Sequence, residues 1–171
     1  MTEFFRGQVF NGNIPEFKYN ENITPRPGFV LQGKHRLIML HDHDFSGIDI
    51  RQALVVPITS AKAEVGRAQR EGRSVIASYV EIDKLRHPFL DDDSYISVGQ
   101  IMPINRKWLI EEQPIGEVES DKMAEVDFVM IRTYGLHETV MAYVAERIKE
   151  ELGRMWIDTS EEEVAADRQG S

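Results

Sequence analysis

Short apolar runs separated by polar turns dominate the first two thirds of the chain. Several runs are rich in β-branched residues, and each has the length of a β-strand. They span residues 7–10, 35–41, 53–58, 74–82 and 95–101. Strands this short, at this spacing, predict a mainly β protein built as a small barrel or sandwich.

Two connecting segments of this first part stand out. Residues 11–28 hold three prolines, two glycines and four asparagines, which predicts a long loop. Residues 61–73 are polar and contain two glycines, so we expect a mobile segment without regular structure.

The hydrophobic period changes to that of helices in the last third. Ser120 is a suitable cap for a helix that Gly135 would end. A second helix is predicted over residues 137–156, with charged residues on its outer face. The two apolar stripes consist of Met123, Val126, Val129 and Met130, and of Met141, Val144, Ile148, Leu152 and Met155. The final segment, TSEEEVAADRQGS, has too little apolar surface to fold and is predicted to be disordered.

Composition narrows the class of protein. The 171 residues allow one ordinary domain, and the absence of cysteine excludes disulfides, zinc knuckles and thiol nucleophiles. No signal peptide or membrane span is evident, which predicts the cytoplasm. Residues 1–80 carry ten Lys/Arg and eight Asp/Glu (+2), whereas residues 81–171 carry ten and twenty-one (−11). A basic groove is therefore more compatible with the first half.

Two polar clusters are candidate cation sites. In a strand, His41 and His43 would share one face, which provides at most two of the ligands that a metal needs. We therefore interpret His41-Asp42-His43-Asp44 as a solvated turn. Asp91-Asp92-Asp93 lacks the spaced oxygen ligands of a calcium loop and is interpreted in the same way. No metal site or other cofactor is predicted.

Common catalytic motifs are absent from the sequence, including GxSxG, the Walker loop, HExxH and the dinucleotide fingerprint. Arg, Thr, Ser, Gln and His residues remain beside the short strands. Such residues suit phosphate recognition and proton transfer at a ribose. Each of them taken alone is more often a structural hydrogen-bonding group.

Five segments, taken in order, resemble the MazF/PemK family of toxin ribonucleases. The most specific is Val55-Val56-Pro57-Ile58-Thr59-Ser60, which is similar to the family's "VxPITS" strand. The others are Arg6–Phe10, Gly33–Leu40, Gly99–Arg106, and Ile115–Val118 with the helix after it up to Leu136. The resemblance spans roughly residues 5–136, and the order and spacing of the segments are more specific than any one of them.

The resemblance implies an SH3-like barrel with C-terminal helices that forms a homodimer. It implies a metal-independent endoribonuclease toxin, which cleaves single-stranded RNA and is neutralised by a cognate antitoxin. In that reaction the ribose 2′-OH attacks the adjacent phosphate and leaves a cyclic phosphate. The expected organisation is a barrel with its closing helix over residues 1–136, an additional helix over 137–157 and an acidic disordered tail over 158–171.

The resemblance also assigns site residues. The catalytic arginine is Arg36 or Arg26; Arg36 lies 23 residues before Thr59 and is favoured by spacing, whereas Arg26 precedes a proline as in the family. The planar fork of an arginine holds two phosphate oxygens. Thr59 corresponds to the catalytic threonine, and Ser60 beside it is able to play the same part. Gln100 corresponds to a residue lining the RNA site, and His35 is a candidate for proton transfer, although a structural role is commoner for a histidine.

Other features favour a second interpretation. Leu37, Gly99 and Met102 depart from the family pattern, and the second half of the chain is acidic. These departures suit a barrel with little or no activity that binds nucleic acid or protein. The apolar stripe of the second helix has three possible partners: its own barrel, a second copy of the chain, or another protein.

Overall fold

A computed structural model describes residues 3–16 and 31–152 of the chain. The chain divides into two compact units, with the boundary between Thr133 and Tyr134. The unit before the boundary contains the β-sheet and two α-helices, and the unit after it contains a helix over residues 137–152. In the described ranges no helix is long and apolar enough to cross a membrane.

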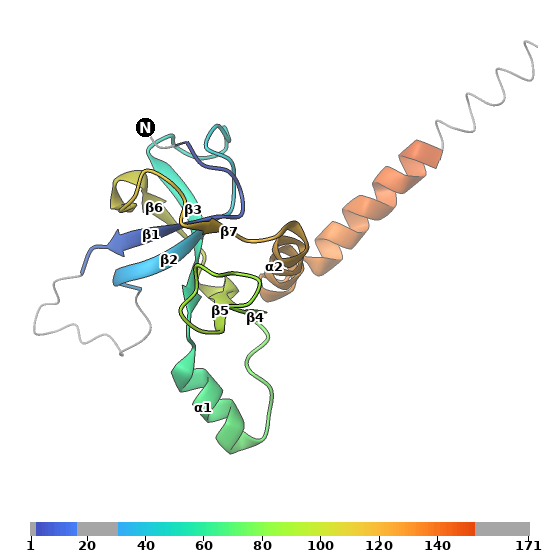
Figure 1. Cartoon of the computed structure of the whole chain (residues 1–171). Helices are drawn as coiled ribbons and strands as arrows, with labels where there is room; N and C mark the ends of the chain where they lie inside the picture. The colour runs from blue at the N-terminus through green and yellow to red at the C-terminus, as the bar shows by residue number, and fades with distance from the viewer. Residues whose placement is uncertain (1–2, 17–30, 153–171) are drawn as a thin grey trace, which may run out of the picture. The chain divides into compact units, whose positions relative to one another are not determined.

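Seven strands of the described part form one antiparallel sheet that curls into a half-barrel (Figure 1). The strands are β1 (Gln8–Ile14), β2 (Gly33–Met39), β3 (Gln52–Thr59), β4 (Tyr79–Ile82), β5 (Ser94–Ser97), β6 (Met102–Asn105) and β7 (Gly116–Glu117). Their order is β4-β5-β3-β2-β1-β7. Along its second edge, β3 pairs with β6 through its first half and with β5 through its last two residues. The predicted mainly β fold is confirmed.

Both faces of the central strands are buried, because side chains alternate along a strand. Leu37 and Met39 of β2 enter one apolar cluster, and Ile38 enters the other. The first cluster contains Phe4, Phe10, Ile14, Leu37, Met39, Ala53, Val55 and Ile104. The second is larger and contains Val9, Ile38, Leu40, Val56, Ile58, Val80, Ile82, Leu90, Ile96, Val98, Val118, Met123 and Val126. Continuous apolar runs in β2 and β3 are therefore required by two cores.

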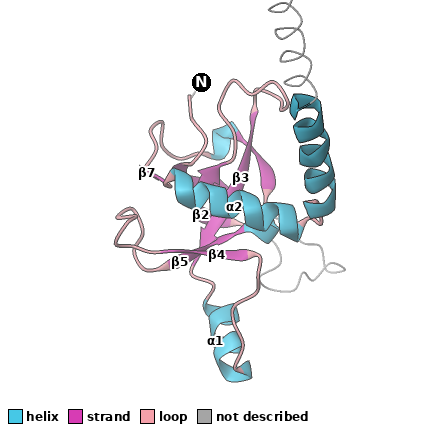
Figure 2. Cartoon of the chain, turned by 90° about the vertical axis from the view of Figure 1, so that its right-hand side faces the viewer, coloured by secondary structure: helices cyan, strands magenta, loops and turns pink. Residues whose placement is uncertain are grey.

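Helix α2 (Ser120–Thr133) covers the second cluster (Figure 2). Met123 and Val126 are buried, while Val129 and Met130 pack against the cluster from the next turns. Gly135 follows the helix with a φ of 69°, a left-handed conformation that glycine adopts without a steric penalty. The helix, its apolar stripe and its glycine end are as predicted.

The first strand is longer than predicted. The Asn11-Gly12-Asn13 segment, expected to be a turn, continues β1 and pairs with β2 from Lys34 to Arg36. Gly12 is required here because a Cβ atom at this position would lie 2.3 Å from the Leu37 side chain. Turn-forming residues were therefore misread as the end of the strand; residues 17–30 of the predicted loop lie outside the described ranges.

The expectation for residues 61–73 was wrong. They form helix α1 (Lys62–Glu71), which extends away from the sheet (Figure 1). Arg73 donates a hydrogen bond of 2.7 Å to the nearly buried Glu64 carboxylate, which also accepts one from the Ile76 N–H. This carboxylate links the helix to the chain that returns to β4. The bond from Arg73 is the main reason that the pKa of Glu64 lies below its ordinary value.

The two predicted strands after α1 are shorter in the structure than in the prediction. Only residues 79–82 of the 74–82 run form a strand. The 95–101 run is divided between β5 and a short 3-10 helix, η1 (Val98–Gln100), after which β6 begins. Ser97 and Val98 are buried. The 3-10 helix redirects the chain, so that β6 pairs with the first half of β3.

The helix over residues 137–152 agrees with the prediction as far as it is described; residues 153–156 and the 158–171 tail lie outside the described ranges. Its predicted stripe is exposed, with 67% of Met141, 42% of Val144, 53% of Ile148 and 51% of Leu152 accessible. Within the helix, Lys149 pairs with Glu146 and Arg147 with Glu150.

Ala61, immediately before α1, has a φ of 48°, which is unfavourable for a residue with a side chain. We expect Ala61→Gly to raise the free energy of unfolding by about 1 kcal/mol, because glycine removes this strain. Ala68→Gly, the same change inside α1, should lower the free energy by about 1 kcal/mol. Denaturant unfolding of the two variants measures both effects. Equal destabilisation by the two changes would show that Ala61 is not strained.

Candidate functional site

Arg36 lies in β2, directly across from Ile58 of β3. Its backbone is therefore one residue away in register from Thr59, the last residue of β3. The side chain is 30% exposed, and its Nη2 donates a hydrogen bond of 2.8 Å to Oδ2 of Asp91. Antiparallel pairing thus places the backbones of the predicted arginine and threonine at neighbouring positions, although they are 23 residues apart in sequence. Because side chains alternate along a strand, Arg36 shares a face of the sheet with Ile58, whereas the side chain of Thr59 points to the opposite face.

Asp91 belongs to the loop between β4 and β5 and is 83% exposed. The hydrogen bond from Arg36, followed by the charge of its guanidinium, holds the pKa of Asp91 below its ordinary value. The carboxylate is therefore ionised throughout the neutral range. The solvated aspartate turn of the sequence analysis is thus exposed as predicted, but one of its members is bonded to a predicted catalytic residue.

Thr59 ends β3, and Ser60 and Ala61 connect it to α1. The Oγ1 of Thr59 accepts a hydrogen bond of 3.2 Å from the N–H of Ala61, the residue with positive φ. Thr59 is half-buried, and Ser60 is exposed. The hydroxyl of Thr59 keeps its own proton for donation, because it is the acceptor in this bond.

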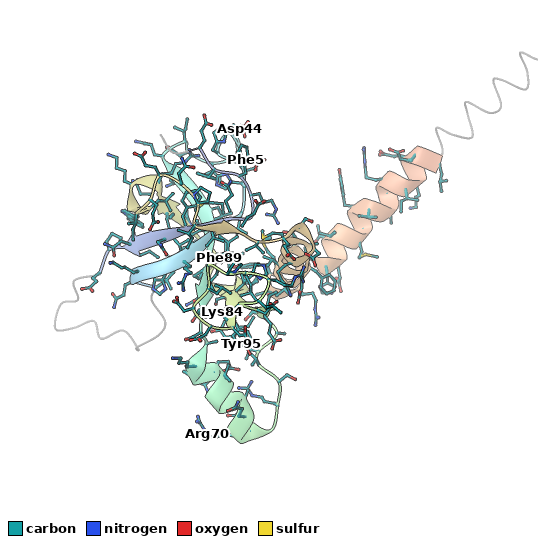
Figure 3. All side chains as sticks on the ribbon, in the orientation of Figure 1. Phe5, Asp44, Arg70, Lys84, Phe89 and Tyr95 are labelled. Carbon is teal, nitrogen blue, oxygen red and sulfur yellow. The ribbon has the colours of Figure 1, made fainter. Side chains whose placement is uncertain are left out.

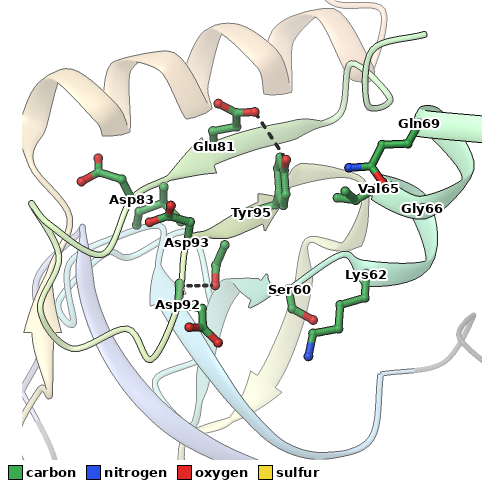
Figure 4. Close-up of a pocket in the computed structure, with 12 residues that line it drawn as sticks. Ser60, Lys62, Val65, Gly66, Gln69, Glu81, Asp83, Asp92, Asp93 and Tyr95 are labelled. Atoms are coloured by element: carbon green, nitrogen blue, oxygen red, sulfur yellow. Dashed lines mark hydrogen bonds between the residues drawn. The ribbon is translucent and has the colours of Figure 1, made fainter. Parts of the chain in front are cut away.

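A pocket of about 620 Å³ opens beside Ser60 (Figure 4). It lies between the start of α1 and the β4–β5 hairpin. The charged residues that line it are Lys62, Glu81, Asp83, Asp92 and Asp93. One cation against four carboxylates makes this side of the site acidic, and such a field repels phosphates at a distance.

Two tyrosines lie near Thr59. Tyr95 of β5 pairs in register with Thr59, and its ring centroid lies 5.9 Å from that of Tyr79 on β4. The hydroxyl of Tyr95 donates a hydrogen bond of 3.4 Å to Glu81. Burial and the charge of Glu81 raise the pKa of Tyr95, so the phenol stays neutral. Such rings are suitable surfaces for stacking nucleic-acid bases.

The remaining predicted site residues are spread out. Gln100 ends η1, a partly buried position after Gly99. His35 precedes Arg36 in β2, so alternation directs the two side chains to opposite faces of the strand. The Nε2 atom of His35 lies 2.8 Å from the carbonyl oxygen of Gln32. The structure thus does not bring His35 together with Arg36, and Arg26 lies outside the described ranges.

The turn at residues 41–44 is a structural element rather than a solvated turn. His41 is only 8% exposed and its Nε2 accepts a hydrogen bond of 3.0 Å from the Leu54 N–H, so its Nδ1 donates to the Asp42 carbonyl. His43 contacts the carbonyl oxygen of Phe4. Figure 3 shows Asp44 and Phe5 at one end of this unit, away from Tyr95 and Lys84. Among the residues that the structure describes, no group of three His, Asp or Glu side chains is arranged to hold a metal.

Sequence analysis missed Asp91, Tyr79 and Tyr95 as members of the site. Each tyrosine lies in a predicted strand, which is only a weak indication that it belongs to the site. Nothing in the sequence indicates the contact between Asp91 and Arg36, since 55 residues separate them and a loop conformation decides it.

Comparison of the sequence with protein-family models found no match, and comparison with curated proteins found none. The structure is similar to two crystal structures of MazE–MazF from Deinococcus radiodurans. Form III superposes with a TM-score of 0.50 and 14% identity, over 77% of this chain and 96% of the other. Form II gives a TM-score of 0.49 and 15% identity over the same shares. The likeness to form III shows that the chain has a MazF-like fold, as the five segments predicted.

Proposed function

We propose that the chain is a MazF-like endoribonuclease toxin that cleaves single-stranded RNA without a metal ion. The observation that carries the proposal is the partly exposed guanidinium of Arg36, which lies on β2 beside the end of β3 in a MazF-like fold. A charged, partly exposed guanidinium suits a phosphodiester. The partners that follow from the proposal are a cognate antitoxin and a second copy of the chain.

In the proposed reaction, the 2′-oxygen bonds to the adjacent phosphorus and the bond from phosphorus to the 5′-oxygen breaks. The 2′-proton leaves to a base and the 5′-oxygen gains a proton, so the products are a cyclic phosphate and a 5′-hydroxyl. Arg36 neutralises the charge that develops on the phosphoryl oxygens. The Thr59 hydroxyl, on the face of β3 opposite to that of Arg36, is a candidate donor to a neighbouring part of the RNA, and the rings of Tyr79 and Tyr95 are candidate surfaces for its bases.

The test is incubation of the purified full-length protein with a long single-stranded RNA in EDTA. Discrete fragments that end in a cyclic phosphate are expected, and a DNA of the same sequence should remain intact because it has no 2′-OH. Expression in cells should arrest growth. Intact RNA over a broad set of sequences would contradict the proposal.

A second candidate function is a barrel that binds nucleic acid or protein without cleaving it. The acidic pocket beside Ser60 favours the protein-binding form of this function, because its carboxylates disfavour an RNA backbone. The same incubation distinguishes the two functions, since a binding module leaves the RNA at its full length.

A further inference from the structure

The phosphate-binding candidate Arg36 already holds an anion supplied by the chain itself. We infer that Asp91 is a resident competitor for the substrate phosphate, so that RNA enters the site by displacing the Asp91 carboxylate from Arg36. The inference rests on the proposed function and specifies how the same site is regulated. The contact is the 2.8 Å bond from Nη2 of Arg36 to Oδ2 of Asp91.

The loop that carries Asp91 is held firmly against the barrel. His87 and Leu90 are buried at 0% and 2% exposure, and the Leu90 N–H donates to the His87 carbonyl. The ring of Phe89 lies against Gly116, where a Cβ atom would be 2.1 Å from it. Figure 3 shows Phe89 and Lys84 on this loop. The competing carboxylate is therefore placed by a packed segment.

Lys84 fixes the last part of the loop. Its Nζ donates a hydrogen bond of 2.5 Å to the carbonyl oxygen of Asp91, and its N–H donates one of 2.9 Å to the Asp93 carboxylate. The ammonium group thus binds the backbone of Asp91 and leaves the side chain to Arg36. Asp91 keeps its position without a second cation on its carboxylate among the described contacts.

The bond between Asp91 and Arg36 uses only part of the guanidinium. The Nε atom of Arg36 is buried and has no hydrogen-bond partner within the described part of the structure. Nε and Nη2 lie on one edge of the planar fork, where two oxygens of one phosphate are able to bind side by side. Asp91 leaves the Nε donor unused, and a phosphodiester that displaces Asp91 would satisfy it once the Arg36 side chain turns toward the solvent.

The competition is weak enough to be overcome by a substrate. An ion pair with one partner 83% exposed changes an equilibrium by no more than about fivefold. The low pKa of Asp91 keeps the carboxylate charged at neutral pH, so the competitor is present under all conditions of RNA binding. We therefore expect removal of Asp91 to tighten RNA binding by about three- to fivefold.

The experiment measures binding separately from cleavage. The full-length protein is titrated in EDTA into a fluorescent pool of 2′-O-methyl RNA oligonucleotides, which lack the nucleophilic hydroxyl. Asp91→Ala and Asp91→Asn are compared with Asp92→Ala, which removes the same charge from the next residue, whose side chain does not contact Arg36 in the structure. Both Asp91 variants should bind more tightly than Asp92→Ala. In the Arg36→Ala background, Asp91→Ala and Asp92→Ala should have equal effects.

Several results would overturn the inference. Equal effects of the Asp91 and Asp92 variants with Arg36 present would mean that only net charge matters. Unchanged binding with slower cleavage of ordinary RNA would make Asp91 a catalytic base, and no binding by any variant would mean that Arg36 is not a phosphate site. Tighter binding by the Asp91 variants with no cleavage by any protein would support the inference and contradict the proposed ribonuclease activity.

Discussion

Arg36→Ala should reduce the rate of RNA cleavage by about 100- to 1,000-fold, as the loss of one group that stabilises charge in a transition state does in other enzymes. The guanidinium lies at the surface and is 30% exposed, so the fold should survive its removal. Arg36→Lys should give an intermediate rate, because an ammonium keeps the charge and loses the planar fork. The measurement is initial rates on one RNA substrate in EDTA.

The matched control is Arg70→Ala, which removes the same charge from an exposed position in the last turn of α1. Its rate should stay within about twofold of the parent, as for most surface substitutions. If Arg36→Ala cleaves as fast as the control, Arg36 is not the catalytic arginine. Arg26→Ala would then be the next variant to measure.

The largest effect on stability is expected for Phe10→Ala. Phe10 is a fully buried member of the smaller apolar cluster. Its truncation should lower the free energy of unfolding by about 3–5 kcal/mol. A domain of this size is stable by only about 5–15 kcal/mol, so the variant should be close to unfolding. Urea denaturation with an unchanged slope gives the value.

Phe5→Ala is the control for this change, because Phe5 is 54% exposed and lies just before β1, the strand that contains Phe10. It should cost less than about 1 kcal/mol. Phe10→Leu, which keeps most of the apolar volume, provides a value if the alanine variant does not fold. A similar loss for Phe5→Ala and Phe10→Ala would show that the smaller cluster is not a tightly packed core.

The sequence predicted the strands and helices that have a clear hydrophobic pattern of their own. The run from Val55 to Ile58 is apolar because two cores bury it, and the stripe of α2 faces one core. Helix α1 was missed because its polar residues and Gly66 weaken the local signal, whereas the contact of Glu64 with Arg73 forms only in the folded chain. Gly12 was misread for a related reason, since its close approach to Leu37 is a property of the paired strands.

The candidate site was predictable to the extent that neighbouring strands define it. Arg36 and Thr59 belong to consecutive strands, and antiparallel pairing brings their backbones together, although their side chains point to opposite faces. His35 was grouped with Arg36 because the two are adjacent in sequence, although adjacent residues of a strand face opposite ways. Asp91 depends on the path of a loop, which no local pattern of residues determines.

The strand order has a consequence for synthesis of the protein on the ribosome. β1 pairs with β7, so Gln8 and Val9 acquire their second neighbours only when Glu117 and Gly116 have been made. β3 likewise lacks the neighbours along its second edge until β5 and β6 have been made. A nascent chain that ends before residue 94 has Arg36 and Thr59 but neither the hairpin with Tyr95 nor the later strands. The enzyme proposed here would therefore remain harmless to the messenger being translated until nearly the whole barrel has emerged.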